Sequence, residues 1–430
     1  MDSHQFGYWG KRMVDYICEY QRTLPERKVI PEVQPGYLRP LLPEEAPEEG
    51  ETWQQIFEDL EKYIVPGAAS PAMTELEVVM MDWMAKLLHL PKEFTHASHE
   101  GGGVIQVNST SVDHQSFLCF HFYQFVNPVE TAICDALWLW WYPYGRLNYK
   151  YAVSAQCLRC LAESTDLHLA PHLLRTVGHQ TGEQSSASDC ILVSMLAARH
   201  YAIRRHKHVF EEKGDKDPKN AVLSRLVAYG SNLAHSCVEK ASVICMVKFR
   251  QLEVDENYSL HGDVLQIALE VCATLGTTAC CSADDLSSLG PVCDNFNVWL
   301  HLDGAYGGNA LILPECKQYL KGIEHVWSLN VNPNKWMLVG FDCSLMWVRD
   351  HQLLTSSMVV NPIYLQHKHS SKTVDFRHWG IPLSRRFRAL KLWFVLRIYG
   401  ASGIREYIRR VSVVLYFLHI FLPNNIQNSG

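Results

Sequence analysis

The sequence has no excess of charge of one sign and no apolar run long enough to cross a membrane. Its 430 residues carry a formal net charge of -6, which gives no reason to expect a nucleic acid as a partner. The longest late apolar run, residues 411–422, contains His419 and is shorter than the roughly 20 residues that a spanning helix needs. We therefore expect neither a nucleic-acid-binding protein nor a membrane protein.

A secretory signal is also missing. Residues 1–5, Met-Asp-Ser-His-Gln, contain neither a basic stretch nor an apolar core. Fourteen cysteines without such a signal are typical of reduced thiols in a reducing compartment. The sequence therefore predicts a cytoplasmic protein.

The composition is that of a globular protein, with 47% hydrophobic and 20% charged residues, and its length allows one large domain with appendages. Residues 8–20 carry apolar side chains at helical spacing. Thr52 and Gln55 form a capping box for a second helix. The apolar residues on one face of that helix are Trp53, Ile56, Phe57, Leu60 and Ile64. Alone, these two helices would leave their apolar faces uncovered, so we expect a homodimer.

Two short motifs carry the chemistry. Asp303 ends the apolar run of residues 298–302, which has the pattern of a buried strand, and a buried acid is costly unless it is paired with a cation. Lys335 lies beside the apolar residues 336–339, a setting that favours the neutral, nucleophilic amine. Together they suggest pyridoxal phosphate, with the lysine as the Schiff base and the acid on the pyridinium nitrogen. The simpler interpretations are a turn or cap aspartate and a solvated surface lysine.

The stretch 298–349 resembles the group II pyridoxal-phosphate-dependent amino acid decarboxylases of the histidine and aromatic-L-amino-acid type. The family has Asp-Ala-Ala-Tyr-Ala-Gly where residues 303–308 read Asp-Gly-Ala-Tyr-Gly-Gly, and Asn-Pro-(His or Ser)-Lys-Trp where residues 332–336 read Asn-Pro-Asn-Lys-Trp. Further matches lie at residues 33–39, 273–278 and 375–388. The resemblance implies an α/β, type I (aspartate-aminotransferase-like) fold with a mainly parallel seven-stranded sheet flanked by helices.

The resemblance also implies which residues hold the cofactor, pyridoxal 5'-phosphate. Small hydroxyl residues open an apolar helix at residue 185, where free N–H groups and the helix dipole would hold the phosphate. An ordinary serine cap is the alternative. Asp303 would keep the ring nitrogen protonated. The implied cofactor-binding residues are Ser186, Ala187, Ser188, His235, Thr278, Asp303, Ala305, Asn332 and Lys335.

The resemblance assigns catalytic roles as well. Lys335 would form the Schiff base, and His235 would stack on the ring and contact the substrate carboxylate. A histidine beside a helix start is otherwise a structural residue. Tyr364 falls on the family tyrosine that helps to protonate the intermediate. Ser384 stands where the aromatic-specific relatives tend to carry glycine, and its hydroxyl suits a smaller imidazole substrate.

Several positions depart from the family pattern. Gly304 and Gly307 replace alanines, which we expect to loosen the pocket. Asn334 replaces the usual His or Ser, and it retains a donor for phosphate. The adjacent Cys280 and Cys281 are expected to be a buried pair of thiols.

Residues 107–184 match no part of the family pattern. Cys157 and Cys160 have the spacing of metal ligands, and His168 and His172 follow them. No second cysteine pair completes a four-ligand zinc site, so we expect no metal.

The resemblance divides the chain into five consecutive parts. They are 1–66, an N-terminal helical dimerisation segment; 67–106, the start of the cofactor-binding large domain; 107–184, an insert; 185–400, the rest of the large domain; and 401–430, a tail in place of the family's small C-terminal domain.

The implied reaction is the decarboxylation of an L-amino acid to its amine. The substrate would be L-histidine, giving histamine, or an aromatic amino acid such as DOPA or 5-hydroxytryptophan. The alternative is a catalytically inactive relative. It is suggested by the insert, the altered tail and the lack of the family's substrate-pocket segment after Gly67.

Overall fold

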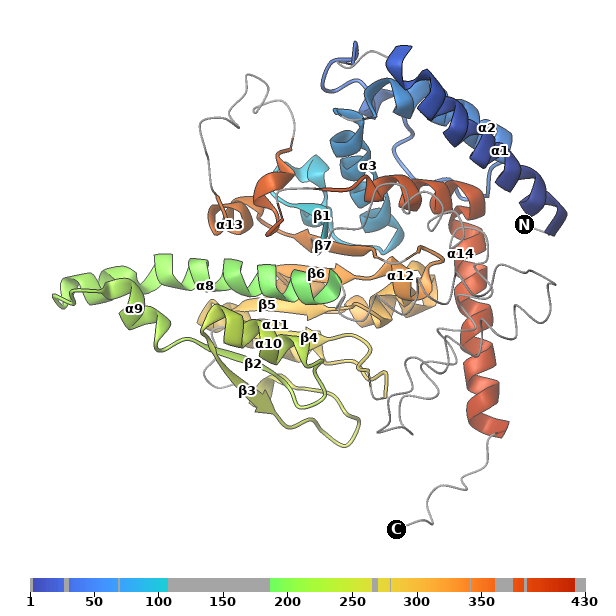
Figure 1. Cartoon of the computed structure of the whole chain (residues 1–430). Coiled ribbons are helices and arrows are strands. Elements are labelled where there is room, and N and C mark those ends of the chain that lie inside the picture. The colour runs from blue at the N-terminus through green and yellow to red at the C-terminus, as the bar shows by residue number, and fades with distance from the viewer. Residues whose placement is uncertain are drawn as a thin grey trace, which may run out of the picture. The chain divides into compact units, whose positions relative to one another are not determined.

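A seven-stranded sheet forms the centre of the computed structural model (Figure 1). The structure describes residues 3–26, 31–68, 70–106, 186–264, 270–278, 280–340, 342–359, 374–382 and 385–421. The strands are β1 (Gly102–Gln106), β2 (Val227–Ser231), β3 (Lys248–Leu252), β4 (Glu270–Thr274), β5 (Trp299–Asp303), β6 (Ser328–Val331) and β7 (Ser344–Val348).

The sheet is mainly parallel. Its order is β1-β7-β6-β5-β4-β2-β3, and only β7 runs antiparallel to its neighbours, β1 and β6. All residues of β1, β5, β6 and β7 are buried, as expected for strands of a sheet that is covered on both faces. The predicted fold class is thereby confirmed.

The described residues also form α-helices. They are α1 (Ser3–Thr23), α2 (Trp53–Asp59), α3 (Ala72–Leu87), α8 (Ser186–Glu212), α9 (Pro218–Leu223), α10 (Cys237–Cys245), α11 (Leu286–Phe296), α12 (Pro333–Trp336), α13 (His351–Ser356) and α14 (Arg388–Phe421). Helix α8 packs along β1, β5, β6 and β7, α3 packs against β1, and α11 against β5 (Figure 1). No helix in the described ranges has the apolar length that a bilayer crossing requires.

Two apolar clusters lie against α8. One joins the middle of α8 to α10 and β2, and includes Met195, Val238 and Ala228. The other joins α8 to the centre of the sheet, and includes Val193 and Trp299. Because the first half of α8 packs in both clusters, its first turn is held at the carboxyl edge of the sheet.

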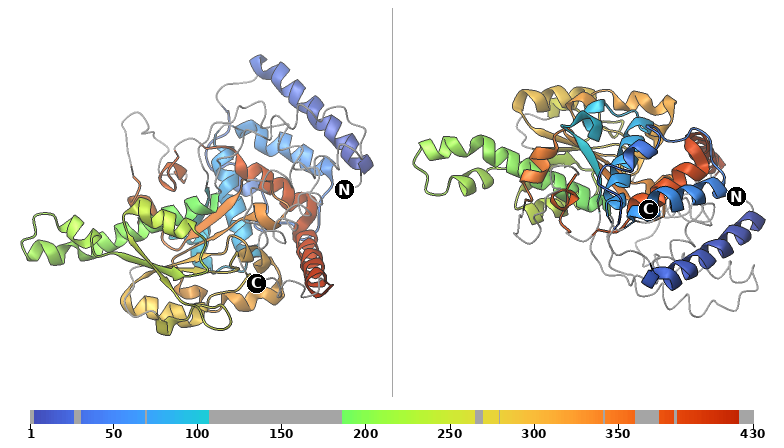
Figure 2. Two further views of the ribbon diagram at one scale, coloured as in Figure 1. Left: turned by 60° about the horizontal axis from the view of Figure 1, so that its bottom comes forward. Right: turned by 90° about the horizontal axis from the view of Figure 1, so that it is seen from above.

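The N-terminal helices form as their sequences predict. Thr52 accepts a hydrogen bond from the Gln55 N–H, and the Gln55 side chain accepts one from the Thr52 N–H, so the predicted capping box is present. The Trp9 ring of α1 stacks on Trp53 at 6.0 Å and on Phe57 at 6.3 Å, so α1 lies beside α2 (Figure 2). The apolar faces of α1 and α2 therefore contact one another within one chain, and the homodimer stays a prediction.

The chain divides into two compact units. The first comprises residues 1–109 and 185–405 and contains the sheet; the second comprises residues 110–184 and 406–430. Helix α14 is interrupted at Gly400, whose φ of 64° and ψ of 170° are not helical. The predicted insert, with the cysteine and histidine spacing considered for zinc, lies outside the described residues.

Carboxylates of α3 hold distant segments in place. Glu75 is only 8% exposed and accepts hydrogen bonds from the N–H groups of Gly36 (2.7 Å) and Leu38 (2.8 Å). Glu77 accepts from the Ile105 N–H (2.8 Å) and from Arg385 (2.6 Å). The connector after α1 and the first strand are thereby fixed to one helix.

We expect Glu75→Gln to lower the free energy of unfolding by about 1–3 kcal/mol, because an amide group would replace a charged acceptor of a buried N–H group. The shift of the urea midpoint, followed by circular dichroism, measures this. Glu61→Gln, at an exposed carboxylate, is the matched control. Equal midpoints for the two variants would contradict the role of Glu75.

Candidate active site

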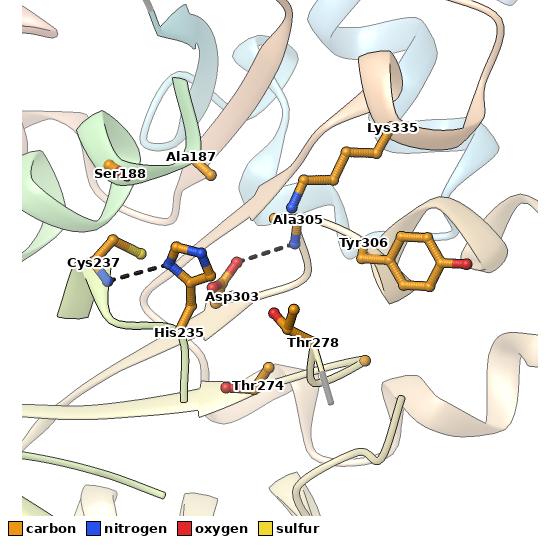
Figure 3. Close-up of a pocket in the computed structure, with 11 residues that line it drawn as sticks. Ala187, Ser188, His235, Cys237, Thr274, Thr278, Asp303, Ala305, Tyr306 and Lys335 are labelled. Atoms are coloured by element: carbon orange, nitrogen blue, oxygen red, sulfur yellow. Dashed lines mark hydrogen bonds between the residues drawn. The ribbon is translucent and has the colours of Figure 1, made fainter. Parts of the chain in front are cut away.

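A pocket opens at the carboxyl ends of the parallel strands β2, β4 and β5 (Figure 3). Such edges are where α/β sheets bind ligands. The residues that line it come from the start of α8, the segments after β2, β4 and β5, and α12; they are Ala187, Ser188, His235, Cys237, Thr274, Gly276, Thr278, Asp303, Ala305, Tyr306 and Lys335. Ala187 and Ser188 therefore lie in one pocket with the other predicted cofactor-binding residues. Asn332 is not among the residues that line it.

Asp303 is the last residue of β5 and is 6% exposed. Its Oδ1 accepts hydrogen bonds from the Ala305 N–H (3.0 Å) and from Asn330 Nδ2 (3.1 Å). The sequence suggested pairing with a cation; among the described residues, the carboxylate is instead stabilised by these two neutral donors. Both donors bind Oδ1. Among the described residues, Oδ2 has no hydrogen-bond partner.

Lys335 lies in the short helix α12, and its N–H donates to the Asn332 carbonyl at 2.9 Å. Its side chain extends toward Ala305 and Asp303 (Figure 3). We expected Lys335 to be enclosed in apolar surroundings. Its side chain is instead half-buried and lines a pocket that also contains His235 and Asp303. The neighbouring Trp336 stacks on Tyr306, with ring centroids 5.0 Å apart and an interplanar angle of 6°, which fixes α12 to the loop after β5.

His235 projects into the pocket opposite Lys335 (Figure 3). Its Nδ1 accepts a hydrogen bond from the Cys237 N–H at 3.2 Å, so Nδ1 carries no proton. Partial burial of the ring lowers the pKa of His235; Asp303 opposes this shift and Lys335 adds to it. The imidazole is therefore neutral at pH 7, and its one proton lies on Nε2.

The start of α8 supplies Ala187 and Ser188 to the pocket. The free N–H groups and dipole of a long helix favour an anion at this end. Ser188 forms a hydrogen bond with the Cys237 thiol, whose pKa burial raises to about 12, so this sulfur adds no negative charge. For Ser186 the structure gives the backbone position in α8 and nothing of the side chain.

Two buried polar atoms near the pocket lack partners among the described residues. Asn332 accepts a hydrogen bond from Ser344 through Oδ1 (2.5 Å), while its Nδ2 has none. Thr274 Oγ1 is likewise buried and without a partner. Unmatched polar groups are costly in an interior, so they indicate a polar ligand that completes them. With the helix N-terminus, the acid and the lysine, the residues present fit pyridoxal phosphate.

Two expectations about the surroundings are wrong. Cys280 and Cys281 are exposed free thiols, because they lie in the turn after β4 and not in the core. A methyl group at Gly307 would lie 2.5 Å from the Leu275 carbonyl oxygen, and one at Gly304 3.0 Å from that of Asn330. These glycines therefore allow close contact between backbone segments and do not loosen the pocket.

The resemblance also singled out Tyr364, Ser384 and Asn334. Tyr364 and Ser384 are outside the described residues. Asn334 accepts a hydrogen bond from the Cys343 N–H at 3.2 Å, so its oxygen serves the packing of β7. Its proposed contact with phosphate stays a prediction.

Sequence reasoning missed four residues that line the pocket: Cys237, Thr274, Gly276 and Tyr306. Each lies close in sequence to a predicted one. Residues that follow the end of a parallel strand share the ligand site at that edge of the sheet. Including the sequence neighbours of each motif residue would therefore have found them.

The family model described as "Pyridoxal-dependent decarboxylase conserved domain" matches residues 67–125 and 137–421. The matched ranges include most of residues 107–184 and the chain to residue 421, both of which were placed outside the family pattern above.

Curated relatives match over nearly the whole chain. Human histidine decarboxylase is 36% identical over 99% of this chain and 60% of its own length. Mouse aromatic-L-amino-acid decarboxylase is 37% identical over 95% of this chain and 79% of its own length. The chain thus spans about three fifths of the histidine decarboxylase it matches.

Solved structures agree with the fold. The Oryza sativa protein TDC with PLP and tryptamine superposes with a TM-score of 0.57 at 25% identity, covering 95% of this chain and 77% of that one. Catharanthus roseus tryptophan decarboxylase in complex with L-tryptophan gives a TM-score of 0.54 at 29% identity, covering 95% and 78%. On the extent of these matches and the geometry of the pocket, the chain belongs to the pyridoxal-dependent decarboxylase family, and its cofactor is pyridoxal 5'-phosphate.

Proposed function

We propose that this chain decarboxylates an L-amino acid to the corresponding amine, as a pyridoxal-phosphate-dependent carboxy-lyase. The observation that carries the proposal is the convergence of Asp303, His235, Lys335 and the start of α8 on one pocket. Family membership supports the reaction class, and the pocket supplies the groups that such a reaction needs.

The cofactor, when bound, supplies an electron sink for the pair of electrons left when CO2 departs. Asp303 would hold its ring nitrogen through the free Oδ2. The N–H groups at the start of α8 with Ser188, and the Nδ2 of Asn332, would hold its phosphate. Lys335 would hold it covalently through the ε-amine.

His235 acts on the substrate as a neutral donor. Because Cys237 N–H occupies Nδ1, only Nε2–H is available to the pocket. In the proposal this N–H donates to the substrate carboxylate and orients the bond that breaks. A neutral imidazole suits the task, because a charged one would stabilise the carboxylate that must be lost.

The substrate we propose is L-histidine or an aromatic L-amino acid. Histidine and aromatic decarboxylases match this chain at 36% and 37% identity, so identity alone does not favour one of them. The hydroxyl of Ser384 favours histidine, and Tyr364 would protonate the carbon after CO2 loss; both roles stay predictions.

We further propose that the chain forms a homodimer, which sedimentation of the purified chain checks. We also propose that it is cytoplasmic.

Adding pyridoxal phosphate should give the purified chain a visible absorbance band that borohydride abolishes by fixing the cofactor to Lys335, located by peptide mapping. Lys335→Ala should show no band and only background amine formation, because the attachment point is gone. Lys317→Ala, at an exposed lysine, is the control.

The substrates to compare by amine chromatography are histidine, DOPA and 5-hydroxytryptophan. A folded chain without a band would point to the inactive relative.

The titration of His235 gives a second test. Its proton resonance, assigned by its loss in His235→Gln, should titrate below the ordinary value of about 6.5. Asp303→Asn removes the negative charge that raises this pKa, so the midpoint should fall further. Lys335→Ala removes a positive charge that lowers it, so the midpoint should rise. Shifts of the opposite sign would refute the electrostatic description of the pocket.

A further inference from the structure

A row of buried polar side chains continues from Asp303 into the interior, away from the pocket. Residues 299, 301 and 303 of β5 alternate with their neighbours, so their side chains share one face of the sheet. On β6, Ser328 pairs with His301 and Asn330 with Asp303. Parallel register thus places these polar side chains next to one another beneath α8.

Hydrogen bonds connect the row without a break. Asn330 Nδ2 donates to Asp303 Oδ1 at 3.1 Å, and Asn330 Oδ1 lies 2.9 Å from His301 Nε2. The other ring nitrogen, Nδ1, lies 2.8 Å from Ser328 Oγ. Ser328 Oγ also accepts from Trp299 Nε1 at 2.9 Å and lies 2.8 Å from Ser194 Oγ of α8.

The chemistry of the end groups fixes every proton in the row. A carboxylate only accepts, so Asn330 must present its NH2 to Asp303 and its oxygen to His301. His301 Nε2 must then carry a proton. Burial lowers the pKa of His301, so the ring is neutral and Nδ1 accepts from the Ser328 hydroxyl. Trp299 Nε1 can only donate, which leaves Ser328 as its acceptor.

All donors therefore point the same way, from Ser194 through Ser328, His301 and Asn330 to Asp303. Hydrogen bonds aligned head to tail polarise one another and strengthen the last one. His301 is 1% exposed, and Ser194, Ser328 and Asn330 are fully buried, so water does not compete for these bonds. The consequence falls on Asp303, the residue proposed to hold the ring nitrogen of the cofactor.

We propose that His301 is a positioning residue for the cofactor: as a neutral, Nε2-protonated imidazole it orients Asn330, which holds the Asp303 side chain with Oδ2 directed to the pocket. Ser328, Trp299 and Ser194 lock the His301 tautomer. The inference rests on the proposed function, because Asp303 matters only if a protonated ring nitrogen binds there. Because Asn330 and His301 are both neutral, the protein stabilises the buried carboxylate without a second buried charge.

Two polar variants of similar size separate the role of the Nε2 proton from packing. His301→Gln places an amide N–H near the position of Nε2 and keeps the donor to Asn330. His301→Asn reaches only the position of Nδ1 and loses that donor. Each apoprotein is titrated with pyridoxal phosphate and with an analogue in which a carbon replaces the ring nitrogen, and the Kd is read from tryptophan fluorescence.

For pyridoxal phosphate, His301→Asn should bind about tenfold more weakly than the wild type, while His301→Gln stays within about twofold, since only the former loses a donor in a charged hydrogen-bond chain. For the analogue, which has no ring nitrogen, both variants should match the wild type. Equal losses for both ligands, or for both variants, would mean a purely structural role and overturn the proposal.

If His301→Asn does not fold, Ser328→Ala tests the same chain at the next link and should weaken pyridoxal phosphate but not the analogue. In the wild-type apoprotein, ¹⁵N spectra of labelled histidine should show the His301 resonances of a ring protonated at Nε2 only. Protonation at Nδ1 would overturn the assignment of the row. Failure of the wild type to bind pyridoxal phosphate at all would instead refute the proposed function, and the ¹⁵N spectrum distinguishes that failure from a wrong tautomer.

Discussion

The carboxylate of Asp303 lies in the protein interior, and the structure of the site depends on how that buried charge is stabilised. An ionised group without donors would be too costly to bury. Ala305 N–H and the Asn330 amide meet this need at 3.0 and 3.1 Å. Asn330 is available because parallel pairing of β5 with β6 puts it opposite Asp303. The pairing that builds the sheet therefore also stabilises the acid.

The same register assembles the rest of the pocket. On the other side of β5, Thr274 of β4 pairs with Asp303, and the turn after β4 brings Thr278 to the pocket. The close approach of Gly307 to Leu275 holds the two loops together. Nearby, burial keeps the His235 ring and the Cys237 thiol neutral at pH 7, so neither competes electrostatically with Asp303.

Much of this was predictable from the sequence because it depends on local patterns. The apolar run before Asp303 predicts a buried strand, and Thr52 with Gln55 predicts a helix start that the structure contains. The roles of Lys335 and His235 came from short motifs of a known family, and the pocket contains both residues.

What the sequence did not predict depends on contacts between segments far apart in the chain. Nothing in the run Trp299 to Asp303 reveals that His301 meets Ser328 and Asn330, because the pairing register of β5 with β6 decides it. The exposure of Cys280 and Cys281 depends on where a turn leaves the sheet. Gly307 resembled a loss of packing, and only the distance to the Leu275 carbonyl shows that a larger residue would not fit.

The central claim is that Asp303 and Lys335 face one cofactor from two sides of the pocket. A crystal structure of the chain grown with pyridoxal phosphate tests it directly. We expect the ring nitrogen within hydrogen-bond distance of Asp303 Oδ2, the phosphate at the start of α8, and a covalent link to Lys335. A cofactor bound elsewhere, or a ring nitrogen that faces away from Asp303, would contradict it.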